Sequence, residues 1–184
     1  NSTDPQAGVW MTNYENHSDV NMMTYSFRED GKFDGHDAKN FGVMVYPDGN
    51  SGTFFEFSIK PYFDAAYIYY YSNGKNPVKL QAVNYETNDG NEAADFGIWN
   101  NAKVVFEKDA LAFYINGKLC VSHFDTYGYT FVNPRFAIYN YDVKASFKNI
   151  TFKNETIDYS DLGKPIWGTG KYYDIVQEDG EEVY

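Results

Sequence analysis

Short runs of alternating apolar and polar residues follow one another along most of the chain. In a β-strand successive side chains point to opposite faces, so this two-residue period predicts strands with one buried face. The pattern is clearest in residues 99–152, where it runs through Val104–Phe106 and resumes in Leu111–Ile115. The dipeptide Asn116-Gly117 follows, and it is typical of a tight hairpin turn that needs positive φ at both positions. We therefore expect residues 99–152 to form a meander of antiparallel strands.

Further strands are expected upstream of this meander, and no convincing amphipathic helix is present. Short strands with closely spaced turn signals predict an all-β fold, a two-sheet antiparallel β-sandwich of the jelly-roll type. We assign residues 9–156 to this sandwich, residues 1–8 to a linker, and residues 157–184 to a C-terminal tail that wraps the sandwich, adds an edge strand or leads into a linker. The expected upstream strands are 9–11, 20–27, 42–47, 54–60, 65–73 and 78–85.

Composition narrows the classes of partner. The chain has 184 residues, which suits one domain, and its aromatic content of 20% is enough for a core with rings left over. A formal net charge of -11 disfavours nucleic acid and anionic membranes. No apolar run is long enough to span a membrane, so membrane insertion is not expected. The single cysteine, Cys120, rules out an intrachain disulfide. No signal peptide is visible, and the polar start NSTDPQAG is typical of a module within a larger multidomain protein.

Two parts of the sequence resemble a known family. The segments KVVFEKDALAFYINGKLCVS and FAIYNYDVKASFKNITF, together with GVMVYPDGNSGTFFEFSIKP, resemble strands of concanavalin A-like or laminin-G-like jelly rolls. Within that group, the resemblance is to bacterial carbohydrate-binding modules of the fructan-binding type and to keto-disaccharide hydrolase-like domains. It covers roughly residues 41–153 and implies a fold that serves many different ligands.

The residue spacings that common hydrolases need are missing. The three histidines are far apart, and neither HExxH nor a phosphate-binding glycine loop occurs. Glycosidases of sandwich fold carry paired carboxylates on one strand face, whereas Glu56 in FFEFSIK has no carboxylate two or four residues away. These absences disfavour an enzyme, although they leave open a carboxylate pair assembled from separate strands.

An excess of tyrosine at alternating strand positions predicts a ligand-binding face. Tyr67, Tyr69 and Tyr71 share one face of an expected strand, and Tyr139 and Tyr141 share one face of another. Aromatic rings pack against the C–H faces of sugars, while amide and guanidinium groups bind the surrounding hydroxyls. The predicted ligand-binding residues are Tyr69, Tyr71, Trp99, Tyr139, Tyr141, Arg135, Asn84 and Gln81.

These features favour a non-catalytic carbohydrate-binding module of a secreted or cell-surface bacterial protein. The strongly acidic balance favours a neutral poly- or oligosaccharide as its ligand. Two alternatives remain open, a protein-binding adhesin domain and a small glycoside hydrolase of the keto-disaccharide type. The resemblance permits the hydrolase, but the missing carboxylate and histidine groupings disfavour it.

Two acidic loops predict at most one structural Ca²⁺, because this ion takes several oxygen ligands from carboxylates, amides and carbonyls. Neither loop matches the spacing of an EF-hand, but the resemblance to laminin-G-like domains implies a structural Ca²⁺. The predicted ligands are Asp30, Asp34 and Asp37, or alternatively Asp89, Asn91 and Asp95 with Asn88 and Glu92 beside them.

The calcium prediction can be checked by thermal unfolding. A ligand that binds only the native state raises the melting temperature, and a 100-fold excess over its Kd adds about 2.7 kcal/mol to the free energy of unfolding. We expect a higher melting temperature in excess Ca²⁺ than in EDTA, with Mg²⁺ as the control ion. Equal melting temperatures in Ca²⁺ and EDTA would remove support for the site.

Overall fold

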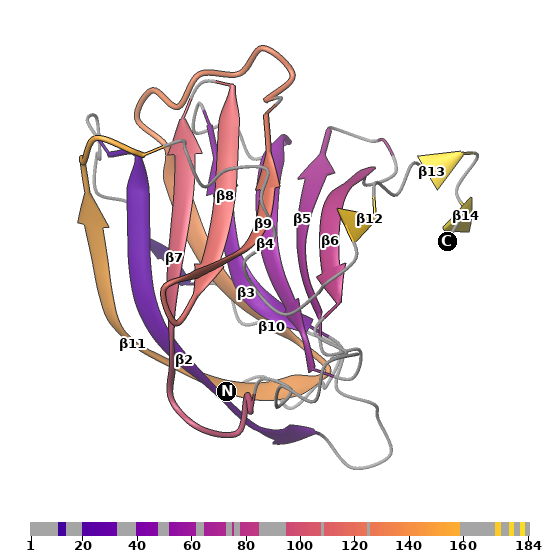
Figure 1. Ribbon diagram of the computed structural model, residues 1–184, viewed down its shortest axis with the longest axis vertical. Helices are drawn as coiled ribbons and strands as arrows, with labels where there is room; N and C mark the ends of the chain where they lie inside the picture. Colours follow the sequence, from indigo (N-terminus) through magenta and orange to yellow (C-terminus); the bar gives the residue numbers. More distant parts are fainter. Residues whose placement is uncertain are drawn as a thin grey trace.

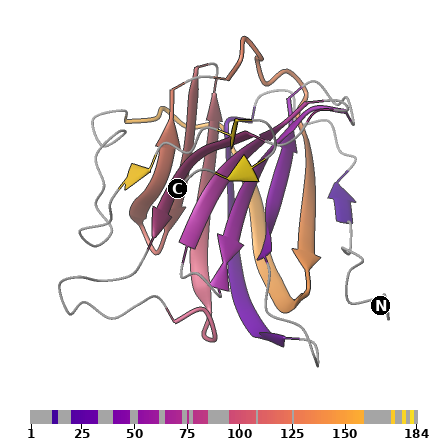
Figure 2. The ribbon, with the colours of Figure 1, turned by 90° about the vertical axis from the view of Figure 1, so that its right-hand side faces the viewer.

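Two antiparallel sheets packed face to face make up the fold, sheet A with seven strands and sheet B with five (Figure 1, Figure 2). This arrangement confirms the predicted two-sheet antiparallel β-sandwich. The computed structural model describes residues 11–13, 20–32, 40–47, 52–61, 65–72, 75, 78–84, 95–107, 109–124, 126–158, 172–173, 177–178 and 181–182.

Sheet A contains β1 (Met11–Asn13), β3 (Asn40–Tyr46), β4 (Phe54–Lys60), β5 (Ala65–Tyr71), β6 (Val78–Asn84), β10 (Arg135–Tyr141) and β12 (Tyr172–Tyr173), in the order β1-β10-β3-β4-β5-β6-β12. Sheet B contains β2 (Met22–Lys32), β7 (Asn100–Glu107), β8 (Ala110–Ile115), β9 (Lys118–His123) and β11 (Val143–Lys153), in the order β11-β2-β7-β8-β9. A separate hairpin pairs β13 (Gln177–Glu178) with β14 (Glu181–Glu182).

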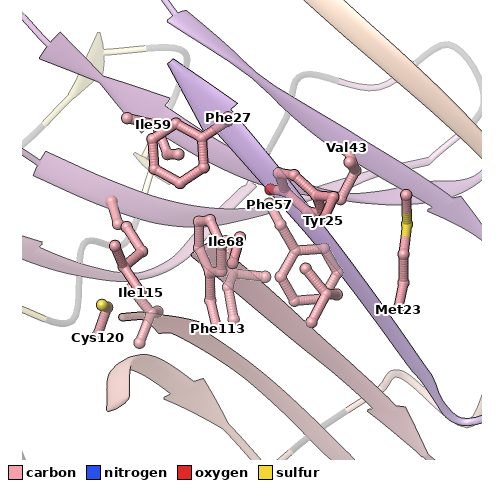
Figure 3. Close-up of a cluster of buried hydrophobic side chains, with 14 of the residues drawn as sticks. Met23, Tyr25, Phe27, Val43, Phe57, Ile59, Ile68, Phe113, Ile115 and Cys120 are labelled. Atoms are coloured by element: carbon pink, nitrogen blue, oxygen red, sulfur yellow. The ribbon is translucent and has the colours of Figure 1, made fainter. Parts of the chain in front are cut away.

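The hydrophobic core lies between the sheets and is built from alternate residues of most of the long strands. On β4, for example, Phe55, Phe57 and Ile59 are fully buried, and the ring of Phe57 meets that of Phe113 on β8 edge-on at 5.9 Å. Figure 3 shows side chains from both sheets pointing into this shared space, with Tyr25 of β2 among them. We call the face of each sheet that is turned away from this core its outer face.

The hairpin predicted at Asn116-Gly117 is present between β8 and β9. Asn116 has φ of 50° and Gly117 has φ of 78°, as the turn requires. The Asn116 side chain also accepts a hydrogen bond from the backbone N–H of Asn101 at 2.9 Å, which ties the turn to β7.

The predicted meander over residues 99–152 is wrong beyond β9. Strands β7, β8 and β9 do pair in sequence, but β10 belongs to sheet A, where it pairs with β1 and β3. β11 then returns to sheet B and pairs with β2. The segment after β9 contains left-handed residues at Tyr127, Gly128 and Asn133, and it carries the chain from one sheet to the other. Strand alternation alone carries no information about which sheet a strand joins.

The beginning of the C-terminal tail lies along the outer face of sheet B. Ile157 packs against an apolar cluster that includes Met22 and Leu119. The side chain of Asn21 makes two hydrogen bonds to the main chain of Glu155. Its Nδ2 donates to the Glu155 carbonyl at 2.7 Å, and its Oδ1 accepts from the Glu155 N–H at 3.0 Å. Further along, β12 pairs with β6 and extends sheet A. Residues 1–8, the predicted linker, lie outside the described residues.

Gly42 is the glycine at which the fold tolerates no side chain. A Cβ at this position in β3 would lie 2.0 Å from the backbone oxygen of Phe57 in β4. We expect Gly42→Ala to lower the free energy of unfolding by about 3 kcal/mol, the upper end of the usual cost of overpacking.

Gly128→Ala is the matched control, because Gly128 also has positive φ, at 78°, but no atom within 4 Å of a Cβ. It should cost only the left-handed backbone penalty, about 1–2 kcal/mol. Urea unfolding of both variants measures the difference, and an equal loss would contradict a steric role for Gly42.

Candidate functional site

The outer face of sheet A carries an unusual mixture of aromatic and polar side chains. Side chains alternate between the two faces along β4. Phe55 and Phe57 point into the core, so Glu56 and Ser58 lie on this outer face. In the neighbouring strands the registers place Met44 on one side of Glu56 and Tyr69 on the other. Sheet B packs against the opposite face of sheet A, so this row of side chains is not part of the central core.

The carboxyl group of Glu56 lies at the centre of this face, within a cluster of polar side chains. It is only 3% exposed, although it is on an outer face. The hydroxyl of Tyr139 donates a hydrogen bond to Glu56 Oε1 and lies 2.9 Å from Ser58 Oγ. Asn40 Nδ2 lies 3.0 Å from Glu56 Oε1 and 3.1 Å from Tyr139 Oη. Tyr71 completes the cluster with a hydrogen bond to the same carboxyl. We call these five residues the Glu56 cluster.

A glycine gives Tyr139 its path to this cluster. Tyr139 lies in β10 directly opposite Gly42 of β3, and Gly42 in turn lies opposite Ser58 of β4. Its hydroxyl reaches Ser58 and Glu56, so the tyrosine side chain crosses β3 at the one position that has no side chain of its own. The absence of a side chain at Gly42 therefore serves both strand pairing and the assembly of the cluster.

Burial controls the protonation of the cluster. Desolvation raises the pKa of the Glu56 carboxyl above its ordinary value, and this effect outweighs the hydrogen bonds from Tyr139 and Tyr71 and the nearby charge of Lys60. Burial also raises the pKa of the Tyr139 and Tyr71 hydroxyls, and the charge of Glu56 raises both further. The cluster thus combines neutral hydroxyl donors with a carboxyl whose affinity for a proton is increased, a combination often found at functional sites.

Aromatic rings surround the Glu56 cluster on the same face. Phe54 stacks on Tyr71 with ring centroids 4.4 Å apart, and Tyr46 lies 5.1 Å from Phe54. Along β5, Tyr67 and Tyr69 stack at 5.7 Å, and Lys60 Nζ lies 5.0 Å and 5.1 Å from their ring centroids. Tyr46, Phe54, Tyr67 and Tyr71 are each half-buried, so part of every ring is accessible to a ligand. These four rings and Tyr69 form what we call the aromatic belt.

Several of the residues predicted from the sequence meet on this face. Tyr71 and Tyr139 both bind Glu56, while Tyr69 is adjacent to Tyr71, with centroids 6.2 Å apart. Arg135 and Tyr141 follow the same alternation of β10 as Tyr139 and are exposed at the two ends of the strand.

Other predicted residues lie elsewhere or outside the description. Gln81 and Asn84 belong to β6, opposite Ile68 and Ala65, but their side chains are not among those described. Trp99 precedes β7 and lies on sheet B, where Lys148 Nζ is 3.7 Å from its ring centroid. The structure therefore separates Trp99 from the tyrosines, because the strand after it pairs with β2 instead of a sheet A strand.

The calcium loops are largely outside the described residues. Asp34, Asp37 and residues 88–92 fall in undescribed segments, so the prediction of a structural Ca²⁺ stays a prediction. Asp30 binds Arg28 Nε at 2.6 Å and accepts a hydrogen bond from Ser146, and Asp95 accepts one from the N–H of Gly97 at 2.8 Å. Within the described ranges, no group of three or more His, Cys, Asp and Glu residues could hold a metal ion.

Sequence reasoning missed the role of Asn40 and Ser58. No second carboxylate shares the strand face of Glu56, yet its partners are hydroxyls and an amide from three other strands. One signal was available, since a glutamate between Phe55 and Phe57 in a buried strand needs polar neighbours on its own face.

A hollow of about 390 Å³ lies apart from this site and is lined by Asn21, Glu107 and Phe131 among others. No helix in the described part of the chain is long and apolar enough to cross a membrane.

Comparison with solved structures shows the same fold in carbohydrate-binding proteins. A carbohydrate-binding module, CBM66, from Bacillus subtilis is 13% identical, with a TM-score of 0.57 over 79% of this chain and 81% of that one. A Bacillus subtilis protein of unknown function with a galectin-like fold is 13% identical, with a TM-score of 0.56 over 81% and 78%. A tetrameric galectin from the ball sponge Cinachyrella is 9% identical, with a TM-score of 0.52 over 78% and 99%. The chain therefore has a galectin-like, concanavalin A-like β-sandwich fold, as expected.

Sequence comparison places the chain in a family. No match was found among curated proteins. The family model for the 3-keto-alpha-glucoside-1,2-lyase-like domain, however, matches residues 10–153, which is more than half of the chain and includes every strand from β1 to β11. The chain belongs to the family of 3-keto-alpha-glucoside-1,2-lyase-like domains.

Proposed function

We propose that this domain binds a neutral poly- or oligosaccharide on the outer face of sheet A, as a module of a secreted or cell-surface bacterial protein. The observation that carries the proposal is the aromatic belt around the Glu56 cluster. Partly accessible rings of Tyr67 and Tyr71 offer apolar surface to the C–H faces of a sugar. The partly exposed Asn40 and the tyrosines of the aromatic belt supply polar groups for its hydroxyl groups.

Two considerations support a neutral sugar on this face. Glu56 would repel an anionic ligand whenever it is ionised, and the net charge of the chain is -11. The similarity in fold to a carbohydrate-binding module of Bacillus subtilis supports a carbohydrate as the ligand. Shallow sites of this kind recover little free energy beyond the cost of association, so we expect Kd values on the order of micromolar to millimolar.

Proton transfer at Glu56 is the second candidate function, and the raised pKa of its buried carboxyl favours it. A 1,2-elimination on a 3-keto-glucoside removes the proton from C2, breaks the C1–O bond and forms a C1=C2 double bond, while the leaving oxygen takes up a proton. A carboxylate whose pKa is raised is a stronger base for the first of these steps. The family match motivates this alternative.

Tyr67→Ala tests the binding face. Loss of one stacking ring removes about 50 Å² of apolar contact, worth about 1.3 kcal/mol, so affinity should fall about tenfold. Calorimetry against neutral fructans, glucans and galactans measures the change, with the melting temperature of the variant recorded alongside.

Tyr127→Ala is the matched control for this variant. Tyr127 is also a stacked tyrosine, 4.2 Å from Tyr70, but it lies on the segment between β9 and β10 and not in the aromatic belt. An equal loss of affinity in both variants, or no binding to any neutral glycan, would contradict the proposed face. Release of the alcohol from a 3-keto-glucoside, abolished by Glu56→Gln, would instead establish the lyase.

The raised pKa of Glu56 has a consequence for stability. In the unfolded chain the carboxyl titrates near its ordinary value of 4.5, whereas the folded state holds its proton to higher pH. The native state therefore binds more protons in this window, and the free energy of unfolding should fall as pH rises from 4.5 through the raised pKa. The slope from one group is at most about 1.4 kcal/mol per pH unit.

Glu56→Gln should remove this contribution. We expect the stability of the variant relative to the native protein to increase with pH across the same window, measured by urea unfolding at several pH values. Glu155→Gln, an exposed side chain beside sheet B, controls for the change in net charge. A pH-independent difference between Glu56→Gln and the native protein would show that folding does not raise the pKa of the Glu56 carboxyl.

A further inference from the structure

The second exposed aromatic feature of the sandwich is Trp99, on the outer face of sheet B. Where β11 pairs with β2, Ser146 lies opposite Arg28 and Lys148 lies opposite Ser26. Where β2 pairs with β7, Ser26 lies opposite Asn101. Phe27 pairs with Asn100, so one position further along Trp99 lies beside Arg28. Trp99 thus continues across the sheet the row formed by Ser146 and Arg28. Trp99 is 38% exposed, and in the described part of the chain only three other aromatic residues, Phe124, Tyr127 and Tyr141, are as exposed.

Two cations are held against this tryptophan. Lys148 Nζ lies 3.7 Å from the ring centroid, and Arg28 Cζ lies 5.0 Å from it. The guanidinium of Arg28 is oriented by Asp30, whose carboxylate accepts from Arg28 Nε at 2.6 Å and from the hydroxyl of Ser146. Only one of its five N–H donors is used in that bond, so the terminal nitrogens can still serve a ligand. Both cations are thus positioned at the ring in advance of binding.

Polar side chains line the same face next to the ring. Ser26 Oγ donates to Asn101 Oδ1 at 2.9 Å, and Asn149 Nδ2 donates to Ser26 Oγ at 3.3 Å. The acidic groups in this neighbourhood, Asp30 and Asp95, are already engaged as acceptors of hydrogen bonds from Arg28 and Gly97. A ring, two cations and a row of hydroxyl and amide groups therefore lie together on one surface.

Cationic side chains gather on this surface, beside the acidic Asp30, Glu107 and Glu155. Four of the nine cationic side chains that the structure describes lie on the outer face of sheet B, namely Arg28, Lys103, Lys148 and Lys153. At physiological ionic strength the Debye length is about 8 Å, so acidic groups on the far side of the sandwich are largely screened here. A net charge of -11 therefore does not prevent an anion from binding at Trp99.

We propose that Trp99, Arg28 and Lys148 form a second carbohydrate site, specific for a sugar residue that carries a carboxylate or a sulfate. The exposed part of the tryptophan ring packs against the C–H face of the sugar, and the guanidinium and ammonium groups bind its anionic group. Ser26 and Asn101 lie in the adjacent row, with Asn149 bonded to Ser26, and serve the sugar hydroxyls. Arginine suits this task because its planar fork matches a carboxylate or sulfate. This site is independent of the neutral-sugar face on sheet A.

The experiment uses the intact chain with three polysaccharide probes in calorimetry at low and physiological salt. Polygalacturonate presents carboxylates, dextran sulfate presents sulfates, and unmodified dextran is the neutral control. We expect one of the two anionic probes to bind, and its affinity to fall about fivefold in Lys148→Gln and in Arg28→Gln, and about tenfold in Trp99→Leu. Lys75→Gln is the matched control, because it removes the same charge from an exposed position next to sheet A.

The outcomes separate this site from non-specific attraction and from the sheet A face. Retained binding of the anionic probe in Tyr67→Ala supports two independent sites, and the preferred probe identifies the anionic group. The proposal is overturned if neither anionic probe binds, or if Lys75→Gln weakens binding as much as Lys148→Gln. It is also overturned if double-stranded DNA binds as tightly as the preferred probe, since charge alone would then explain the interaction. Melting temperatures of all variants distinguish lost binding from lost folding.

Discussion

The two-residue period of β4 couples the candidate site to the hydrophobic core. Phe55, Phe57 and Ile59 fill the space between the sheets, so Glu56 and Ser58 must project from the opposite face. A slip of one residue in register would bring the glutamate into the core and expose the rings. The packing energy of the aromatic core therefore also determines where the Glu56 carboxyl lies relative to β3, β5 and β10.

Burying a carboxyl on this face requires side chains that provide both area and hydrogen bonds. Tyrosine does both, because its ring covers neighbouring atoms and its hydroxyl donates a hydrogen bond. Tyr139 and Tyr71 bind Glu56 in this way, and a phenylalanine at either position would leave the carboxyl short of a donor. This gives a physical reason for part of the high tyrosine content, which a sandwich core alone does not need.

The two outer faces of the sandwich differ in their chemistry. On sheet A the aromatic belt surrounds a carboxyl with raised pKa, which suits the hydroxyl groups of neutral sugars. On sheet B an exposed tryptophan is flanked by cations, and the start of the C-terminal segment covers an apolar cluster through Ile157. The sandwich thus presents two large surfaces of different chemistry, one on each sheet.

Much of the secondary structure was determined by the sequence alone. Strand β4 was expected at residues 54–60 and lies there, and the Asn116-Gly117 turn formed as its positive φ angles require. Local alternation was also enough to place Tyr67, Tyr69 and Tyr71 together on one face, because neighbours two apart in a strand always share a side. The resemblance to sugar-binding sandwiches and keto-disaccharide hydrolase-like domains likewise came from short strand motifs.

Only the tertiary structure decided which strands became neighbours. It placed β10 in sheet A beside β3, and so brought Tyr139 across Gly42 to a glutamate 83 residues earlier in the chain. It also placed Trp99 on the other sheet, away from the tyrosines. Alternation specifies which side chains of one strand share a face, but strand pairing depends on how all the strands bury their apolar faces together. The partners of Glu56 could therefore not be read from the spacing of residues around it.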